Sequence, residues 1–106
     1  MFSIFGKNNY NTISVHDLDD KTRIINLIDV RESNEYKAGH VPTAKNIPMR
    51  SVLAQPEKYL DKLKEYHIIC QSGARSSSTC KALSSQGFQV INVSGGTGSY
   101  IHSLER

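Results

Sequence analysis

Three short, largely apolar runs alternate along this chain with segments suited to helices, and this alternation limits the possible folds more than any other feature. The runs cover residues 24–30, 66–70 and 89–93. Apolar, β-branched composition that continues through a run is typical of strands covered on both faces, as in a parallel sheet. Parallel strands need crossover connections, which the intervening helical segments supply. The pattern therefore predicts an α/β domain with a mainly parallel sheet.

The remaining segments complete this prediction. We expect a short strand at 12–15, with Ser14 or Asp17 capping a brief helix towards Asp20, and a strand at 46–48 whose proline indicates a sheet edge or a strand end. Helices are expected at 33–38, 49–54, 56–64 and 74–86. The glycine-rich turn at 94–98 is expected to lead into a last helix that runs to the C-terminus.

Size and composition narrow the functional classes. The 106 residues suit one domain, 1–106, with one core and no linker or repeat. The net charge is +3, but Lys and Arg are spread along the chain, so we expect small anions rather than a nucleic acid as partners.

Because no apolar run approaches the length of a spanning helix and 1–9 lacks the features of a signal peptide, we expect no membrane partner. The histidines and the two cysteines show no metal-ligand spacing, so no metal is predicted. Two cysteines are too few for a secreted disulfide scaffold, which favours free thiols and the cytoplasm.

One of these cysteines lies where ligands bind in such folds. Cys70 ends an apolar run and precedes the longest helical segment, so it is expected at the carboxyl end of a strand, the edge at which parallel sheets bind ligands. The loop that follows consists of Gln71, Ser72, Gly73, Ala74, Arg75 and Ser76. Its glycine and small side chains allow a tight turn with N–H groups directed inward, and the following helix adds its positive end. The loop is therefore predicted to bind anions around the sulfur.

The same surroundings favour the thiolate form of Cys70. A free cysteine has a pKa of about 8.5, whereas thiols at helix N-termini reach about 3.5 to 7.5, so no histidine base is required. His67 is expected on the opposite face of the strand from Cys70, since alternate residues of a strand share a face. The alternative is that Cys70 is a small buried side chain with a packing role, which the loop composition disfavours.

These residues resemble the single-domain form of the rhodanese (sulfurtransferase) family. The resemblance rests on two segments, Ile28–Pro48 with Asp-Val-Arg-Glu and Gly-His-Val, and Cys70–Gly96 with Cys-Gln-Ser-Gly-Ala-Arg-Ser and the double glycine, and spans residues 24–100. The spacing from Cys70 to Arg75 is one residue shorter than the loop that cradles phosphate in related phosphatases and some arsenate reductases, which favours sulfur over a tetrahedral oxyanion. Two residues depart from the pattern: Thr43 replaces a frequent glycine, and Tyr100 a frequent tryptophan.

The resemblance implies a three-layer domain with a five-stranded, mostly parallel sheet flanked by helices, and an enzyme without a cofactor. Cys70 would accept a sulfur atom from a small anionic donor, thiosulfate or a persulfide, and pass it to a thiol, cyanide or a sulfur-acceptor protein. The rival hypothesis keeps the fold but makes the domain a persulfide relay or redox-sensing module that acts with a protein partner. The donor, the acceptor and the oligomeric state are not encoded in any recognisable motif.

The sequence allows more than one role for each of the other polar residues. Arg31 could attract an anionic donor, but a structural ion pair with Glu32, Glu35 or Asp29 is favoured. Arg75 could equally attract a donor or brace the loop by binding a carboxylate. His40 is expected to form structural hydrogen bonds in a turn. Cys80 is expected in the core rather than in a disulfide with Cys70.

Overall fold

The computed structural model describes residues 10–18 and 24–106. The expectation about a signal peptide at 1–9 and the helix limit at Asp20 lie outside the described residues. Within the described ranges, no helix is long and apolar enough to cross a membrane.

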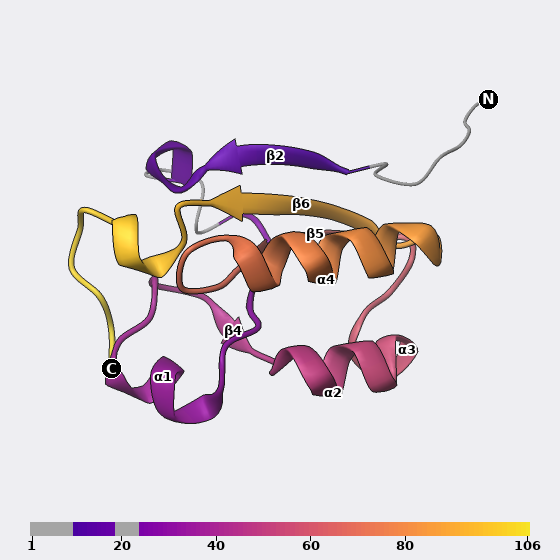
Figure 1. Cartoon of the computed structure of the whole chain (residues 1–106), viewed down its shortest axis with the longest axis horizontal. Helices are drawn as coiled ribbons and strands as arrows, with labels where there is room; N and C mark the ends of the chain where they lie inside the picture. The colour runs from indigo at the N-terminus through magenta and orange to yellow at the C-terminus, as the bar shows by residue number, and fades with distance from the viewer. Residues whose placement is uncertain (1–9, 19–23) are drawn as a thin grey trace.

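Five parallel strands form one sheet in the order β2-β6-β5-β3-β4. The strands are β2 (Asn11–Ser14), β3 (Leu27–Asp29), β4 (Lys45–Asn46), β5 (Glu65–Ile69) and β6 (Gln89–Ser94). In Figure 1 the arrowheads of β2 and β6 point to the end of the molecule that also holds α1 (Ser33–Ala38) and the loop leading into α4 (Ala74–Ser85). The predicted α/β class and five-stranded parallel sheet are confirmed, and the carboxyl ends of the strands share one edge with the cysteine loop.

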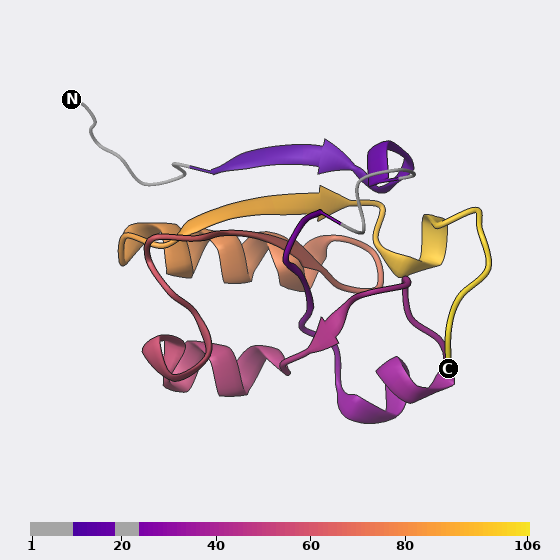
Figure 2. The ribbon, with the colours of Figure 1, turned by 180° about the vertical axis from the view of Figure 1, so that it is seen from behind.

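Each face of the sheet has its own hydrophobic cluster. On one face, Ile28, Ile68 and Cys70 of the sheet region pack with Val52 of α2 (Met49–Ala54) and Leu83 of α4. Tyr59 of the short helix α3 (Pro56–Tyr59) lies against the same cluster. Figure 2 shows from behind that α4 and the α2–α3 pair lie along the length of the strands.

The other face is covered mainly by a 3₁₀ helix, η1 (Val15–Leu18), and by the loop between α1 and β4. Val15 and Leu18 pack there with Leu27, Ile69 and Val93. Ile68 and Ile69 therefore face opposite clusters, as the two-residue repeat of a strand requires. The burial of both faces explains why β3 and β5, in the middle of the sheet, do not alternate between apolar and exposed polar residues.

The bounds of two strands, β3 and β4, differ from those predicted from the sequence. The run at 24–30 forms a strand only over β3, because pairing with β5 begins at Leu27 and pairing with β4 at Ile28. Ile24, outside this pairing, is 82% exposed. The strand predicted at 46–48 is β4, Lys45–Asn46, and it is an edge strand as its proline indicated. Pro48 itself precedes α2 and accepts hydrogen bonds from the N–H groups of Ser51 and Val52.

Two helix predictions were too long. The helix predicted at 56–64 ends at Tyr59, since Leu60 turns into extended backbone and is buried, and the Asp61 carboxylate binds the N–H of Leu63 in a local turn. The last helix predicted to reach the C-terminus is wrong. Only η2 (Thr97–Ser99), a single 3₁₀ turn, forms, and the chain beyond it has no further helix and pairs Glu105 with His40 in an isolated bridge.

Thr43 is the one described residue other than glycine with a positive φ, at 74°. This region costs an L-residue about 1–2 kcal/mol, and a β-branched side chain is among the least suited to it. We expect Thr43→Gly to raise the free energy of unfolding by about 1 kcal/mol, measured by urea denaturation. Thr12→Gly, in the exposed strand β2, is the control and should lower it by about 0.5–1 kcal/mol. A loss of stability in Thr43→Gly would show that the Thr43 side chain repays the strain.

Candidate active site

Cys70 lies between the end of β5 and the start of α4, with its sulfur enclosed by the loop. The N–H groups of Gly73 and Ser76 donate to Sγ at 3.1 and 3.2 Å, and the Ser76 hydroxyl oxygen lies 3.4 Å away. Gly73 has a φ of 106°, a conformation that favours glycine, and this allows the loop to turn back over the sulfur. Two of the N–H groups of the loop, those of Gly73 and Ser76, therefore point inward at the sulfur.

These contacts set the charge state of the Cys70 thiol. Burial raises its pKa, but hydrogen bonds from the Ser76 hydroxyl and from the N–H groups of Ser76, Gly73 and Ser72 outweigh burial, so the pKa lies below its ordinary value. The Ser76 hydroxyl also lies 3.1 Å from the Gly73 carbonyl, to which it donates. In the thiol form S–H can therefore donate to the Ser76 oxygen, and on ionisation the hydroxyl proton can turn to the sulfur. The site favours a thiolate without a histidine base.

Removing this hydroxyl gives a testable change. We expect Ser76→Ala to raise the pKa of Cys70, because one donor to the thiolate is lost while the Ser76 N–H remains, and to slow alkylation of Cys70 by iodoacetamide at pH 7 by about threefold to tenfold. The measurement is the alkylation rate against pH. Ser78→Ala, on the exposed side of α4, is the matched control and should leave the profile unchanged. An unshifted profile in Ser76→Ala would show that the backbone N–H groups alone hold the thiolate.

The glycine-rich turn after β6 orients the first peptide groups of the loop. The Thr97 N–H donates to the Cys70 carbonyl at 2.8 Å, and the Gly98 N–H donates to the Gln71 carbonyl at 3.0 Å. In a planar trans peptide the N–H points away from the carbonyl, so the N–H groups of Gln71 and Ser72 point away from η2. This agrees with the Ser72 N–H acting on the Cys70 thiolate.

Arg75 is fixed by a carboxylate of α1. Its guanidinium forms a two-pronged ion pair with Glu35, at 2.8 and 3.0 Å. Glu35 also accepts the N–H of Glu32, and Arg75 lowers the pKa of Glu35 to about 2. Glu35 therefore stabilises the fold at pH values above its ordinary 4.5, and this contribution is lost as the pH falls towards 2. The geometry supports a bracing role for Arg75 rather than a free charge for donors.

Arg31 and Asp29 form a second, fully buried ion pair beside the loop. Arg31 contacts both Asp29 carboxylate oxygens, at 2.9 to 3.1 Å, and its guanidinium also donates to the Gly39 carbonyl at 2.8 Å. A further N–H reaches the side-chain oxygen of Gln71 at 3.1 Å. Arg31 therefore ties the end of β3 to the first residue of the cysteine loop.

The structure brings together all seven predicted residues from Cys70 to Ser76, with Arg31 and Asp29 beside them. His67 is buried within β5 and Cys80 within the core, where burial and the charge of Cys70 raise the pKa of Cys80 to about 12. His40 stacks on Tyr36, with a centroid distance of 3.7 Å, and bonds the Tyr36 carbonyl. Sequence reasoning missed Glu35 as the partner of Arg75, and it missed the Thr97 and Gly98 N–H groups, for which the glycine-rich turn was the available signal.

The comparisons with known proteins agree with this geometry. A family model described as "Rhodanese-like domain" matches residues 13–102. The "Putative sulfurtransferase YtwF" of Bacillus subtilis is 51% identical over 72 residues, 66% of this chain and 67% of that protein. The "Thiosulfate:glutathione sulfurtransferase" of Saccharomyces cerevisiae is 31% identical over 104 residues, 80% of this chain and 75% of the relative.

The match to a third relative covers less than half of that protein. The "Putative sulfur carrier protein YrkF" of Bacillus subtilis is 39% identical over 75 residues, which are 70% of this chain but only 40% of that protein. Among solved structures, SSP1007 from Staphylococcus saprophyticus has a TM-score of 0.82 at 32% identity, covering 91% of this chain and 99% of its own.

Proposed function

The chain belongs to the rhodanese-like domain family, and we propose that it is a sulfurtransferase in which Cys70 carries the transferred sulfur as a persulfide. Relatives named as sulfurtransferases support sulfur transfer as the general activity. The observation that carries the proposal is the position of the Cys70 sulfur, on which the Gly73 and Ser76 N–H groups converge at the start of α4. A thiolate held in this way is an activated nucleophile for covalent catalysis.

The reaction consists of two balanced displacements. The Cys70 thiolate attacks the outer sulfur of thiosulfate, the sulfur–sulfur bond of the donor breaks, and sulfite leaves with the electron pair. The anionic outer sulfur of the persulfide then accepts hydrogen bonds from the loop N–H groups, as an oxyanion does in acyl transfer. An acceptor thiolate or cyanide attacks that outer sulfur, and Cys70 leaves as the thiolate.

Backbone dipoles rather than free cations are proposed to attract the donor. Arg75 is paired with Glu35, and Arg31 is paired with Asp29, so neither guanidinium presents an uncompensated charge. The N–H groups at the start of α4 and the positive end of its dipole favour small anions at this place. Thiosulfate and low-molecular-weight persulfides fit this chemistry, and the free thiols Cys70 and Cys80 suit a reducing compartment such as the cytoplasm.

The test is the intact mass of the reduced protein after incubation with thiosulfate. We expect the addition of one sulfur atom to the wild type and to Cys80→Ala, because the Cys80 thiol has a high pKa and is buried. Cys70→Ser should show no addition. The proposal would be contradicted by an unchanged mass of the wild type, or by equal sulfur addition to the wild type and to Cys70→Ser.

A persulfide relay is the second candidate, favoured by the relative that is named as a sulfur carrier. Steady thiosulfate:cyanide turnover by the wild type would support the enzyme. A single sulfur addition without turnover, together with a Cys70-dependent mixed disulfide to one dominant protein, would support the relay.

A further inference from the structure

Three arginines follow the carboxyl ends of neighbouring strands, on the same edge of the sheet as Cys70. Arg31 follows β3, Arg50 follows β4 and Arg75 follows β5. All three are paired with carboxylates of the single segment 29–35, which contains the end of β3 and the start of α1. One acidic segment therefore compensates the positive charges that follow three strand ends around the candidate site.

Of these arginines, Arg75 is the one placed to act on a donor. It directly precedes Ser76, whose N–H donates to the Cys70 sulfur at 3.2 Å. Its side chain is 38% exposed, whereas that of Arg31 is 4% exposed. The pKa of Arg75 is raised mainly by its hydrogen bonds to Glu35 and further by the charge of the Cys70 thiolate. The Arg75 guanidinium is therefore accessible to solvent and within electrostatic reach of the sulfur.

Glu35 holds this guanidinium with both of its carboxylate oxygens, at 2.8 and 3.0 Å. The Glu35 carboxylate is itself held in place by α1, because it accepts the N–H of Glu32 in a capping box. Arg75 lowers the pKa of Glu35 to about 2, so Glu35 is charged at every pH at which a thiolate forms. The positive charge of Arg75 is therefore compensated before a donor arrives.

This compensation bears on the charge of the donor. The loop N–H groups around Cys70 suit one anionic sulfur, but thiosulfate carries a second charge, which its sulfonate oxygens share. When the outer sulfur of thiosulfate contacts Cys70, these oxygens lie on the outer side of the loop, where Arg75 is exposed. A free guanidinium there would attract the second charge, whereas the Glu35 carboxylate beside it offsets that attraction.

We propose that Glu35 is a positioning residue that makes the site select sulfur donors with one negative charge over donors with two. Glu35 acts through Arg75, whose guanidinium it holds and neutralises. The inference rests on the proposed function, because it concerns the donor of the same sulfur transfer.

The probes are thiosulfate, with two negative charges, and methanethiosulfonate, in which a methyl group replaces one charged oxygen. With either donor the Cys70 thiolate attacks the outer sulfur and the sulfur–sulfur bond breaks. Sulfite or methanesulfinate leaves with the electron pair. The measurement is the second-order rate constant of sulfur addition, from the intact mass of the whole chain against time. Because both donors react with the same thiolate, a general change in the loop cancels in the ratio of the two constants.

Glu35→Gln should raise the ratio of the thiosulfate constant to the methanethiosulfonate constant by about fivefold. The charge of Arg75 is then uncompensated, while the glutamine oxygen keeps the capping bond from the Glu32 N–H. Arg75→Gln should lower the ratio, because the unpaired Glu35 carboxylate repels the second charge of thiosulfate. With both substitutions together, the ratio should return to within about twofold of the wild type.

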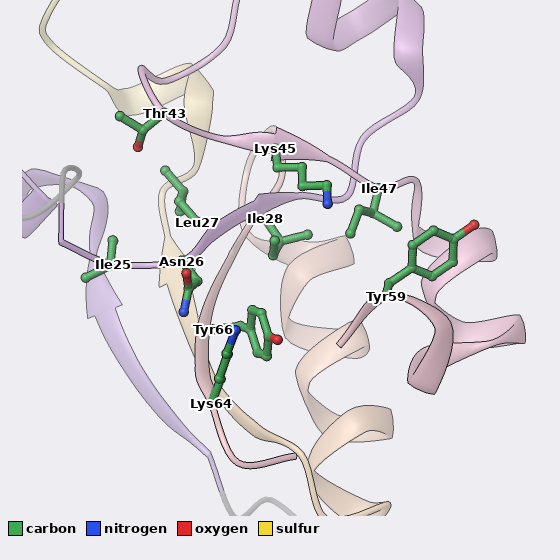
Figure 3. Close-up of a pocket in the computed structure, with 10 residues that line it drawn as sticks. All are labelled: Ile25, Asn26, Leu27, Ile28, Thr43, Lys45, Ile47, Tyr59, Lys64 and Tyr66. Atoms are coloured by element: carbon green, nitrogen blue, oxygen red, sulfur yellow. The ribbon is translucent and has the colours of Figure 1, made fainter. Parts of the chain in front are cut away.

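Glu65→Gln is the matched control, because it makes the same change in net charge at the far end of β5. Glu65 is exposed at the amino end of this strand, about 16 Å from Cys70. It lies between Lys64 and Tyr66, which Figure 3 shows at a pocket beside the amino ends of β3 and β5. Charges more than about 10 Å apart are largely screened at 0.1 M salt, so the ratio should stay unchanged.

Three results would overturn the inference. The first is a ratio for Glu35→Gln within twofold of the wild type, the second is an equal rise in Glu65→Gln, and the third is the full rise in the variant that lacks both Glu35 and Arg75. A wild type that takes sulfur from neither donor would instead overturn the proposed function, so the two failures are distinguishable.

Discussion

Replacing Gly96 with alanine is expected to lower the free energy of unfolding by about 3–5 kcal/mol and to abolish sulfur addition to Cys70. A Cβ at this position would lie 2.6 Å from the carbonyl carbon and oxygen of Gln71, and closer still to the carbonyl oxygen of Cys70. These atoms belong to the backbone and cannot rotate away. The φ of 64° and ψ of −166° add strain, because this region is open essentially to glycine alone.

The loss of sulfur addition follows from the hydrogen bonds that the alanine would disturb. To admit a methyl group, η2 must move away from the loop, which breaks the bonds from Thr97 and Gly98 to the carbonyls of Cys70 and Gln71. Gly87→Ala is the matched control: its φ of 93° is also positive, but its Cβ would meet only the flexible Lys62 side chain at 4.0 Å. Urea denaturation should show a loss of about 1–2 kcal/mol for Gly87→Ala. If both variants lose the same free energy of unfolding, then glycine is needed at position 96 because of its backbone conformation and not because of its close approach to the loop.

Replacing Arg31 with methionine should cost about 3–5 kcal/mol, because it leaves the Asp29 carboxylate buried without its cation. Asp29 is completely buried and Arg31 is 3% exposed, so water cannot replace the lost contacts. Arg50→Met is the control, since Arg50 pairs with Glu32 on the surface, and its loss should be below about 1 kcal/mol.

A double variant separates the charge from the packing of this pair. Asp29→Asn combined with Arg31→Met removes the uncompensated charge, and at least half of the stability lost in Arg31→Met should return. The measurement is again the free energy of unfolding in urea. If the double variant is no more stable than Arg31→Met, then the bonds from Arg31 to Gly39 and Gln71 hold this end of the domain together, and the ion pair does not.

Much of the fold could be predicted because local patterns determine it. Pro56 begins α3, Gly73 allows the turn before α4, and the apolar strands report burial on both faces. The ends of elements were less predictable because they depend on distant partners. The residues after the turn at 94–98 were expected to form a helix, yet only one 3₁₀ turn forms, and the Thr97 and Gly98 N–H groups bind carbonyls of the cysteine loop, which no local pattern reports.

The candidate site shows the same division. The loop from Cys70 to Ser76 is contiguous, so its composition and the following helix were enough to predict its shape, whereas its catalytic role stays a prediction until the sulfur addition is measured. The partners of Arg31 and Arg75 lie in part far away in the sequence: Glu35 on α1 and the Gln71 side chain are each 40 positions from the arginine that they contact. Which carboxylate an arginine selects is decided by the packing of α1 against the loop, and the sequence alone left that choice open.

The pairing of β2 with β6 bears on the order in which the domain assembles. Asn11 pairs with Ile91, and Ser14 pairs with Ser94, so a strand near the start of the chain completes its bonds only with one of the last strands. During synthesis β2 must therefore wait until β6 has left the ribosome, while β3, β4 and β5 can already associate. Because such distant pairings carry the greatest loop-closure entropy, the β2 edge is expected to form late in folding, after the strands that hold the cysteine loop have met.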